Sequence, residues 1–278
     1  MKTSMKKTLL TIFAVSALSL SACGGGGTED NAANNEGTDT EKKVLNVGTE
    51  ATFPPFEFMD KGEVTGFDVD LLNAVAEEAG YEVKIDNTGW DAMFAGLQSE
   101  QLDLGMAGIT ITDERIESYD FSDPYFESKT MVVFKEGVTI EKADDLKGKK
   151  LGVQNGTTGQ FAAEAVVGQN SPDISKYETA ALMFQALQSD NVEAVVTDIA
   201  VALEYQKNNP DSGLKTMSDD EEFQSEYYGI AFPKGSELTE EFDAALDTVL
   251  DNGTYAEIYQ KWFGEEPNVD ALKEAAEQ

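Results

Sequence analysis

The chain has 278 residues, 41% of them hydrophobic, which is enough to build one large or two medium domains with buried cores. Its 53 acidic and 20 basic residues give a net charge of −33, which argues against nucleic acid or an anionic membrane surface as a direct partner. The lack of histidine removes the usual general base and the commonest metal ligand, so we expect no metal and no cofactor.

The N-terminal residues indicate export. Three lysines precede an uncharged, mostly apolar run from Thr8 to Leu20, which is too short to span a bilayer but suits a signal-peptide core. Small residues then precede Cys23, the only cysteine, as in a bacterial lipobox. We therefore predict a signal peptide over residues 1–22 and a lipid anchor, including palmitate, on Cys23 at the outer face of the cell membrane. Ordinary signal cleavage beside an unmodified cysteine is the alternative.

The segment after Cys23 predicts a tether. Four glycines are followed by a mixture of Thr, Glu, Asp, Asn and Ala that has almost nothing to bury. We place a flexible tether at residues 23–43, with a root-mean-square reach of roughly 25 Å. Such a tether holds a globular domain near a membrane without fixing its orientation.

The first half of the mature chain alternates between strand and helix patterns. A short apolar run that begins at Val44 predicts a strand, and it leads into a loop that ends at Pro55. Ligands often bind at such loops, at the carboxyl ends of strands. The further expected elements, in chain order, are a hairpin turn at 60–62, a helix that Asp68 caps and Gly80 ends, a strand at 81–85, a helix at 90–99 and a strand at 102–106.

The stretch from Gly105 to Tyr125 carries the strongest functional signal. Thr112 suits a helix N-cap, which places Arg115 near the third helical position. A cation there opposes the helix dipole by roughly 0.3 to 1 kcal/mol, so the arginine needs a separate reason. Its planar fork matches a carboxylate in a bidentate manner. The alternative is a surface arginine paired with Asp113 or Glu114.

The second half repeats part of the first. The eleven residues from Met93 to Asp103 recur as Met183 to Glu193 with five identities, and each copy predicts a helix, a polar turn and a strand. We therefore expect two lobes of similar βα construction. The other elements expected are strands at 131–134, 151–153, 192–197 and 228–232, a helix at 240–252 and a helical apolar stripe at 255–262.

Two strand ends in this half suit a ligand. Gln154 begins a loop that leads through Thr157 and Thr158 into a helix, where free N–H groups and the helix dipole favour an anion. A plain helix cap is the alternative. Asp198 follows a strand of buried type and either caps the next helix or binds a ligand.

The segments Gly108-Ile-Thr-Ile-Thr-Asp-Glu-Arg115 and Tyr119-Asp-Phe-Ser-Asp-Pro-Tyr125 resemble the polar amino-acid-binding proteins of bacterial ABC importers. These are family 3 extracellular solute-binding proteins, and the likeness, closest to arginine- and glutamine-binding members, runs through nearly all of the mature chain. It implies an α/β, two-lobed periplasmic-binding-protein (Venus flytrap) fold with two crossover hinge segments. We place lobe 1 at residues 44–128 and 227–278, and lobe 2 at 129–226.

The resemblance also implies contacts for the carboxylate end of an amino acid. Arg115, the Thr110 hydroxyl and the backbone N–H groups of Thr157 and Thr158 would bind the α-carboxylate. Charged groups that lose water in a closed cleft need such paired, charge-assisted bonds.

For the rest of the ligand, the resemblance implies that Asp198, the Gly108 carbonyl and Thr110 would bind the α-ammonium. Phe53 and Trp90 would sandwich the stem of the ligand. Glu50 and Gln154 would face the tip of its side chain, and a carboxylate there favours arginine or lysine, with glutamine close behind. A surface glutamate is the alternative for Glu50.

The expected partners are therefore a free amino acid, the transmembrane subunits of an ABC permease and, through the lipid, the membrane. We expect the protein to be a monomer and to catalyse no reaction. Two other functions stay open at this stage. Dehydratases of aromatic amino-acid precursors resemble this family in fold, and an acid would have to transfer the proton in such an enzyme. An extracellular sensor that serves a signalling partner is the second.

Overall fold

The computed structural model describes residues 42–277, which lie within one compact unit. The predicted signal peptide, Cys23 and all but the last two residues of the predicted tether lie outside the described residues. Within residues 42–277, no helix is both long enough and apolar enough to cross a membrane. The same range contains no cluster of three or more acidic, Cys or His groups suited to a metal ion.

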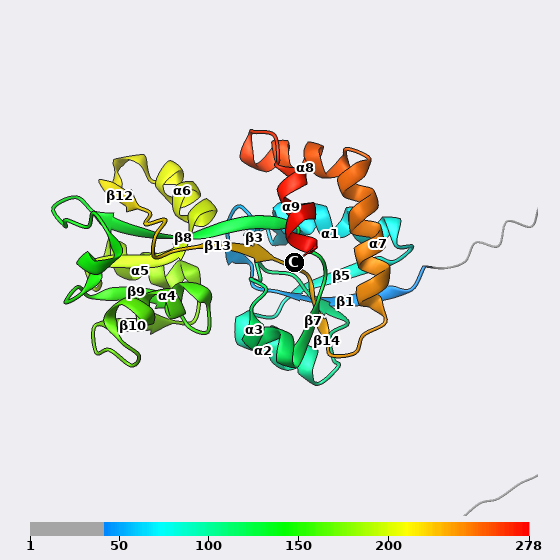
Figure 1. Cartoon of the computed structure of the whole chain (residues 1–278), viewed down its shortest axis with the longest axis horizontal. Helices are drawn as coiled ribbons and strands as arrows, with labels where there is room; N and C mark the ends of the chain where they lie inside the picture. The colour runs from blue at the N-terminus through cyan, green and yellow to red at the C-terminus, as the bar shows by residue number, and fades with distance from the viewer. Residues whose placement is uncertain (1–41, 278) are drawn as a thin grey trace, which may run out of the picture. The chain divides into compact units, whose positions relative to one another are not determined.

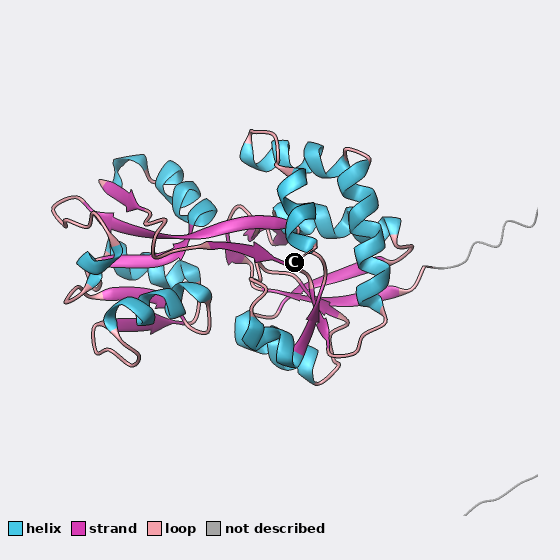
Figure 2. Ribbon diagram, viewed as in Figure 1, coloured by secondary structure: helices cyan, strands magenta, loops and turns pink. Residues whose placement is uncertain are grey.

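The first lobe is built on a twisted sheet with the strand order β5-β1-β6-β14-β7, with helices packed around it (Figures 1 and 2). β1 runs parallel to β5 and β6, whereas β14 is antiparallel to β6 and β7. The strands are β1 (Val44–Thr49), β5 (Glu82–Asn87), β6 (Leu104–Gly105), β7 (Tyr119–Phe121) and β14 (Ala231–Pro233). The helices are α1 (Phe67–Glu78), α2 (Trp90–Gln98), α3 (Asp113–Ser118), α7 (Leu238–Asp251), α8 (Thr254–Phe263) and α9 (Val269–Ala276).

Apolar periodicity explains this packing. In β1, Leu45 and Val47 are buried while Val44 and Asn46 are exposed, which is the alternation of a strand with one covered face. In α1, the buried apolar side chains recur at helical spacing, and α1 contacts both α7 and α8. A small hairpin sheet in the order β2-β3-β4 lies beside α1 and consists of β2 (Thr52–Phe53), β3 (Glu57–Asp60) and β4 (Glu63–Thr65).

The second lobe is built on a sheet with the strand order β10-β9-β11-β8-β12 (Figure 1). β9 pairs in parallel with β10 and β11, and β8 is antiparallel to β11 and β12. The strands are β8 (Phe126–Lys135), β9 (Leu151–Gln154), β10 (Ile174–Tyr177), β11 (Ala194–Asp198) and β12 (Leu214–Met217). The helices are α4 (Thr158–Val167), α5 (Ala180–Gln188), α6 (Ile199–Asn208) and the 3-10 turns η1 (Ala143–Leu146) and η2 (Pro210–Ser212).

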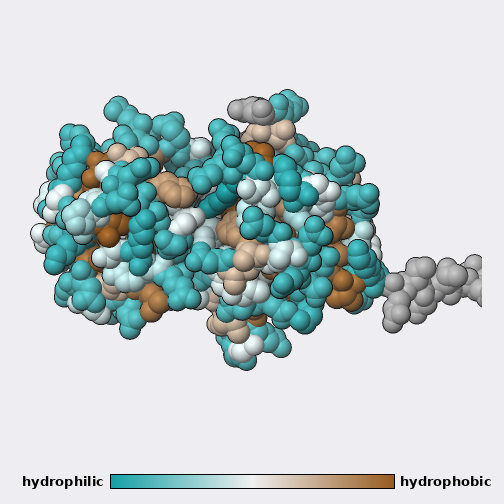
Figure 3. All heavy atoms as spheres, turned by 90° about the horizontal axis from the view of Figure 1, so that it is seen from below, coloured by the Kyte–Doolittle hydropathy of each residue, from teal (hydrophilic) through white to brown (hydrophobic). Residues whose placement is uncertain are grey.

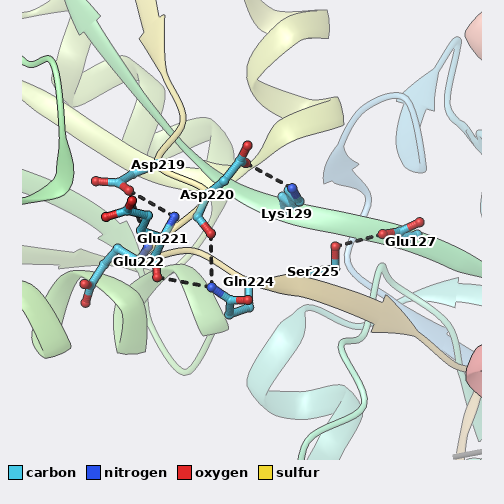
Figure 4. Close-up of polar contacts among 8 residues, drawn as sticks. All are labelled: Glu127, Lys129, Asp219, Asp220, Glu221, Glu222, Gln224 and Ser225. Atoms are coloured by element: carbon cyan, nitrogen blue, oxygen red, sulfur yellow. Dashed lines mark hydrogen bonds and ion pairs between the residues drawn. The ribbon is translucent and has the colours of Figure 1, made fainter.

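Two paired strands connect the lobes. The long strand β8 continues out of the second sheet, and its first residues pair in antiparallel fashion with β13 (Ser225–Tyr228), which brings the chain back (Figure 1). Around this ribbon Lys129 Nζ lies 3.0 Å from Asp220 Oδ1, and Ser225 Oγ donates to Glu127 at 2.8 Å (Figure 4). Exposed contacts of this kind contribute about 0 to 1 kcal/mol, so they leave the ribbon free to bend.

We propose that the lobe boundaries fall within this ribbon, between residues 128 and 129 on the outgoing strand and between 226 and 227 on the returning strand, which are the positions predicted from the sequence. Segment ends of this kind absorb the backbone changes of hinge closure.

The sequence repeat has a counterpart in the structure. α2 and α5 both end in a serine C-cap, and the next residues, Glu100 and Asp190, have positive φ angles of 55° and 57°. Few non-glycine residues adopt this conformation, so its recurrence at matched positions shows that both lobes use the same helix-to-strand turn.

Some predicted elements differ in detail. Asp68 does not cap α1, because the N-cap is Gly66 and Asp68 lies in the first turn with its side chain turned into the protein. The strand expected at 102–106 spans only Leu104–Gly105, and the one expected at 228–232 is divided between β13 and β14. α9 had no counterpart among the predicted elements.

The face of the protein in Figure 3 is covered mainly by hydrophilic side chains, with apolar residues in small separate patches. That distribution agrees with the large excess of acidic residues, which favours solubility through charge repulsion.

Candidate functional site

All ten residues that the sequence predicted as ligand contacts line one cavity between the lobes. Ala107 also lines it and was not predicted. Lobe 1 contributes Glu50, Phe53, Trp90, Ala107, Gly108, Thr110 and Arg115, and lobe 2 contributes Gln154, Thr157, Thr158 and Asp198.

The sheets explain how residues so far apart in sequence meet. Glu50 follows β1, Gly108 lies just after β6, Gln154 ends β9 and Asp198 ends β11. β1 and β6 are parallel neighbours, as are β9 and β11, so each lobe presents the carboxyl ends of its strands to the cavity.

Arg115 lies in the wall of the cavity and is only 9% exposed. Its guanidinium carbon lies 5.2 Å from the centre of the Trp90 ring and 5.6 Å from that of Phe94. Nη1 donates to the Thr110 carbonyl oxygen at 2.7 Å, and Nη2 donates to the Gly156 carbonyl oxygen in lobe 2 at 3.1 Å. The alternative of a surface ion pair is therefore wrong for this side chain.

The helix that carries Arg115 begins as the sequence predicted. Thr112 is the N-cap of α3, and its hydroxyl accepts a hydrogen bond from the Arg115 N–H at 3.2 Å. Burial lowers the pKa of Arg115 to about 10, and the nearby negative charges of Glu226 and Asp198 oppose that shift. The guanidinium therefore stays charged at neutral pH.

Asp198 directs its carboxylate to the cavity rather than to its own helix. It is the N-cap residue of α6, yet its side chain makes no capping bond and instead accepts from Ser128 Oγ at 3.1 Å. Burial raises the pKa of Asp198 to about 7, the negative charge of Glu226 adds to the shift, and hydrogen bonds from Tyr228 and Ser128 oppose it. Of the two readings of this residue, the capping bond is excluded.

Glu50 is also inside the protein, with 3% of its surface exposed, so it is not a surface glutamate. Its Oε2 accepts from Gln154 Nε2 at 3.0 Å across the two lobes, and Oε1 accepts from the Thr52 hydroxyl. Burial raises the pKa of Glu50, and both of these hydrogen bonds oppose the rise.

The loop after Gln154 serves both as a helix cap and as part of the cavity wall. Thr157 is the N-cap of α4 and its hydroxyl accepts from the Gln160 N–H at 3.4 Å. Thr157 and Thr158 nevertheless line the cavity. The first N–H groups of a helix have no acceptor within it, so this end can bind an anion.

The sequence did not reveal Glu226. This residue lies on β13 opposite Ser128, and its Oε2 accepts from Thr110 Oγ1 at 3.1 Å. One signal was available, because strand alternation places Glu226 on the same face as the buried Tyr228, two residues further on. Arg115 thus shares the cavity lining with the carboxylates of Glu50 and Asp198, and Glu226 contacts the lining residue Thr110.

Two α/β lobes on a paired-strand ribbon, with a cavity of buried charges and aromatic rings between them, define a binding protein of the periplasmic-binding-protein class. The sequence pattern of the bacterial extracellular solute-binding proteins, family 3, matches residues 45–265. The chain belongs to this family.

Three relatives illustrate the similarity. A probable histidine-binding protein of Neisseria gonorrhoeae is 42% identical over 269 residues, which cover 95% of this chain and 97% of that protein. The arginine-binding extracellular protein ArtP of Bacillus subtilis (strain 168) is 34% identical over 261 residues, 93% of this chain and 98% of ArtP. The structure of the arginine-, lysine-, histidine-binding protein ArtJ of Geobacillus stearothermophilus superposes with a TM-score of 0.81 at 54% identity, covering 84% of this chain and 100% of ArtJ. All three are named as amino-acid-binding proteins, as expected for a chain that is predicted to bind an amino acid and to catalyse no reaction.

Proposed function

We propose that the protein captures a free amino acid with a cationic side chain, arginine or lysine in preference to glutamine, and delivers it to the permease of a bacterial ABC importer. The observation that carries this proposal is the charge arrangement of the cavity, whose lining holds one guanidinium and the carboxylates of Glu50 and Asp198, with Glu226 bonded to the lining residue Thr110. The arginine- and lysine-binding activities in the names of ArtP and ArtJ support it.

The contacts suggest how an amino acid would be held. The α-carboxylate binds Arg115 and the N–H groups that begin α4. The Thr110 hydroxyl already donates to Glu226, so its oxygen is left to accept from the α-ammonium together with Asp198. Phe53 and Trp90 enclose the stem of the ligand, since both line the cavity. The side chain of the ligand then extends toward Glu50 and Gln154.

Titration of the protein with each of the twenty amino acids, followed by calorimetry or by Trp90 fluorescence, tests this function. Arginine and lysine are expected to bind most tightly, with glutamine and histidine weaker and glutamate weakest, because Glu50 repels a second carboxylate. No binding of any amino acid would overturn the proposal, and tight glutamate binding would overturn its charge preference.

Replacing Glu50 with glutamine is expected to weaken arginine and lysine binding selectively. A hydrogen bond to a charged partner is worth about 1.5 to 3 kcal/mol, so the loss should be roughly tenfold or more. Glutamine affinity should change little, because the new amide still offers an oxygen. Competition titrations of the parent and the variant measure both effects.

Glu117→Gln is the matched control for that experiment. It removes the same charge from an exposed position in lobe 1 and should leave both affinities unchanged. Equal losses for arginine and glutamine in Glu50→Gln would assign Glu50 a structural role and not a selective one.

The anchor is a second part of the proposed function. We infer that residues 1–22 direct export and that Cys23 carries the lipid that retains the domain at the outer face of the membrane. Cys23→Ser is expected to release the protein from the membrane fraction with its affinity for arginine intact. Cell fractionation measures this, and a variant that stays in the membrane fraction would contradict the lipid anchor.

A further inference from the structure

Two buried acidic side chains lie behind the cavity wall, at Gly108. Glu57 on β3 is 1% exposed and Asp68 on α1 is 2% exposed. Asp68 Oδ2 accepts from the Gly108 N–H at 2.9 Å and from the Tyr125 hydroxyl at 2.9 Å. Asp68 Oδ1 and both Glu57 oxygens are buried and have no N–H or O–H donor elsewhere in residues 42–277. Three buried acceptor oxygens without donors indicate a missing proton between the two groups.

Electrostatics decides where that proton resides. Two adjacent carboxylates in a site closed to water cannot both be ionised. Burial raises the pKa of Glu57 well above its usual value, and the charges of Asp68, Glu50 and Asp198 raise it further. Burial also raises the pKa of Asp68, but only to about 6, because hydrogen bonds from Gly108, Tyr125 and Glu57 stabilise its ionised form.

Other titratable groups face the pair. The Tyr125 hydroxyl contacts Asp68 directly. Burial raises the pKa of the Tyr255 hydroxyl well above its usual value, and Tyr259 and the charge of Asp68 add to the shift. Burial likewise raises the pKa of Tyr125 well above its usual value, so this phenol stays neutral and remains a donor. Because Gly108 and Tyr125 donate to Asp68 and nothing donates to Glu57 in residues 42–277, the pair holds its negative charge on Asp68 and its proton on Glu57.

We propose that Glu57 and Asp68 share one proton, and that the ionised Asp68 is a positioning residue that fixes the Gly108 turn of the ligand cavity. The inference rests on the proposed function, in which the cavity that Gly108 lines holds the ligand. A charged acceptor holds an N–H about twice as strongly as a neutral one.

The Gly108 turn needs such a restraint. Its φ angle is +54°, and a Cβ at this position would lie 3.1 Å from the Phe53 ring and 3.3 Å from the Tyr228 ring. A side chain here would be strained and crowded, so glycine is favoured; glycine is conformationally permissive and does not hold this conformation by itself. Asp68 accepts a hydrogen bond from the Gly108 N–H, and the rings of Phe53 and Tyr228 fill the space next to Gly108.

Infrared difference spectroscopy of the full chain at pH 8 tests the shared proton. At that pH Asp198, with a pKa of about 7, and Asp243, with a pKa of about 6, are mainly ionised. The parent is expected to show the carbonyl stretch of a protonated carboxyl group, and Glu57→Gln is expected to lack it. A parent spectrum without this band would overturn the proposal, whatever the protein binds.

Calorimetric titration with arginine tests the positioning role. The Glu57→Gln amide donates to Asp68 as the protonated acid does, so its affinity should stay within about threefold of the parent. Glu57→Ala removes the donor and should bind more weakly, so that glutamine rescues what alanine loses. Asp68→Asn replaces the charged acceptor with a neutral one and should weaken binding about fivefold or more.

The outcomes separate this inference from the proposed function. A parent that binds no amino acid contradicts the function, while the infrared band still tests the shared proton. A parent that binds arginine, with equal losses in Glu57→Gln and Asp68→Asn, contradicts the positioning role. If Asp68→Asn does not fold, the comparison of Glu57→Gln with Glu57→Ala still decides it.

Discussion

Arg115→Ala is expected to weaken arginine binding at least about thirtyfold. The variant would close an α-carboxylate into the cavity without its counter-charge, and truncating one partner of a buried charge pair costs about 2 to 5 kcal/mol. Arg115 is the only arginine in the chain, so no neighbouring guanidinium replaces it. Calorimetric titration of the parent and the variant measures the loss.

The structure adds a second expectation for this variant. The guanidinium donates to two carbonyl groups and packs against the rings of Trp90 and Phe94. Leaving buried acceptors without a donor costs about 1 to 3 kcal/mol each, so the unliganded variant should also unfold at a lower temperature.

Two further variants separate these effects. Arg115→Lys keeps the positive charge but loses the planar fork, so its affinity should lie between those of the parent and the alanine variant. Lys234→Ala removes a cation that donates to the carbonyl of Ile116 in α3, the helix that also carries Arg115. This variant should leave the affinity for arginine unchanged. A near-normal dissociation constant for Arg115→Ala would remove Arg115 from the binding site.

The candidate site was predictable where local sequence carries the signal. Thr112 and Arg115 are three residues apart, so one helical turn of sequence is enough to recognise both the N-cap at Thr112 and the unfavourable position of the Arg115 charge in the helix dipole. The contacts of Glu50 and Asp198 came from the family resemblance. Their local patterns suited a surface glutamate and a helix cap equally well, and only burial between the lobes distinguishes the alternatives.

The features that sequence could not show are contacts between distant segments. Asp68 looks like an N-cap because an acid precedes an amphipathic helix, but its partners Gly108 and Tyr125 are 40 and 57 residues away. Glu226 meets Thr110 across 116 residues, through the pairing of the two crossover strands. Local propensity contains no information about the contacts of Asp68 or the contact between Glu226 and Thr110. The order of strands and helices that brings these residues together was largely predictable.

Arginine binding is expected to weaken about tenfold as the pH falls from 8 to 6. The unliganded Asp198 carboxyl has a pKa of about 7, raised first by burial and then by the charge of Glu226. An α-ammonium binds the ionised carboxylate, so below pH 7 the ligand has to displace a proton, which costs up to about one factor of ten per pH unit. Titrations in two buffers of different ionisation enthalpy should show nearly one proton released per ligand bound at pH 6.

The same group predicts the opposite pH trend for the unliganded protein. The pKa of Asp198 is about 7 in the folded state, above the usual value of 3.8. Between pH 3.8 and about pH 7 the folded state therefore binds more protons than the unfolded state. Stability therefore increases as the pH falls from about 7 toward 4, while ligand affinity decreases. Thermal unfolding of the unliganded protein over this range measures the first trend, and the titrations measure the second.

Asp198→Asn and Asp243→Asn assign the effect to one carboxyl group. Asp198→Asn should bind arginine more weakly at pH 8 and with little change between pH 8 and 6, because its amide neither titrates nor carries the charge that the ammonium needs. Asp243 also has a raised pKa, of about 6, but it lies on α7 and accepts from the Asp123 N–H at 2.8 Å, away from the cavity lining. Asp243→Asn should keep the pH dependence of the parent. A parent affinity that is constant from pH 8 to 6 would show that the ligand does not bind at the ionised Asp198.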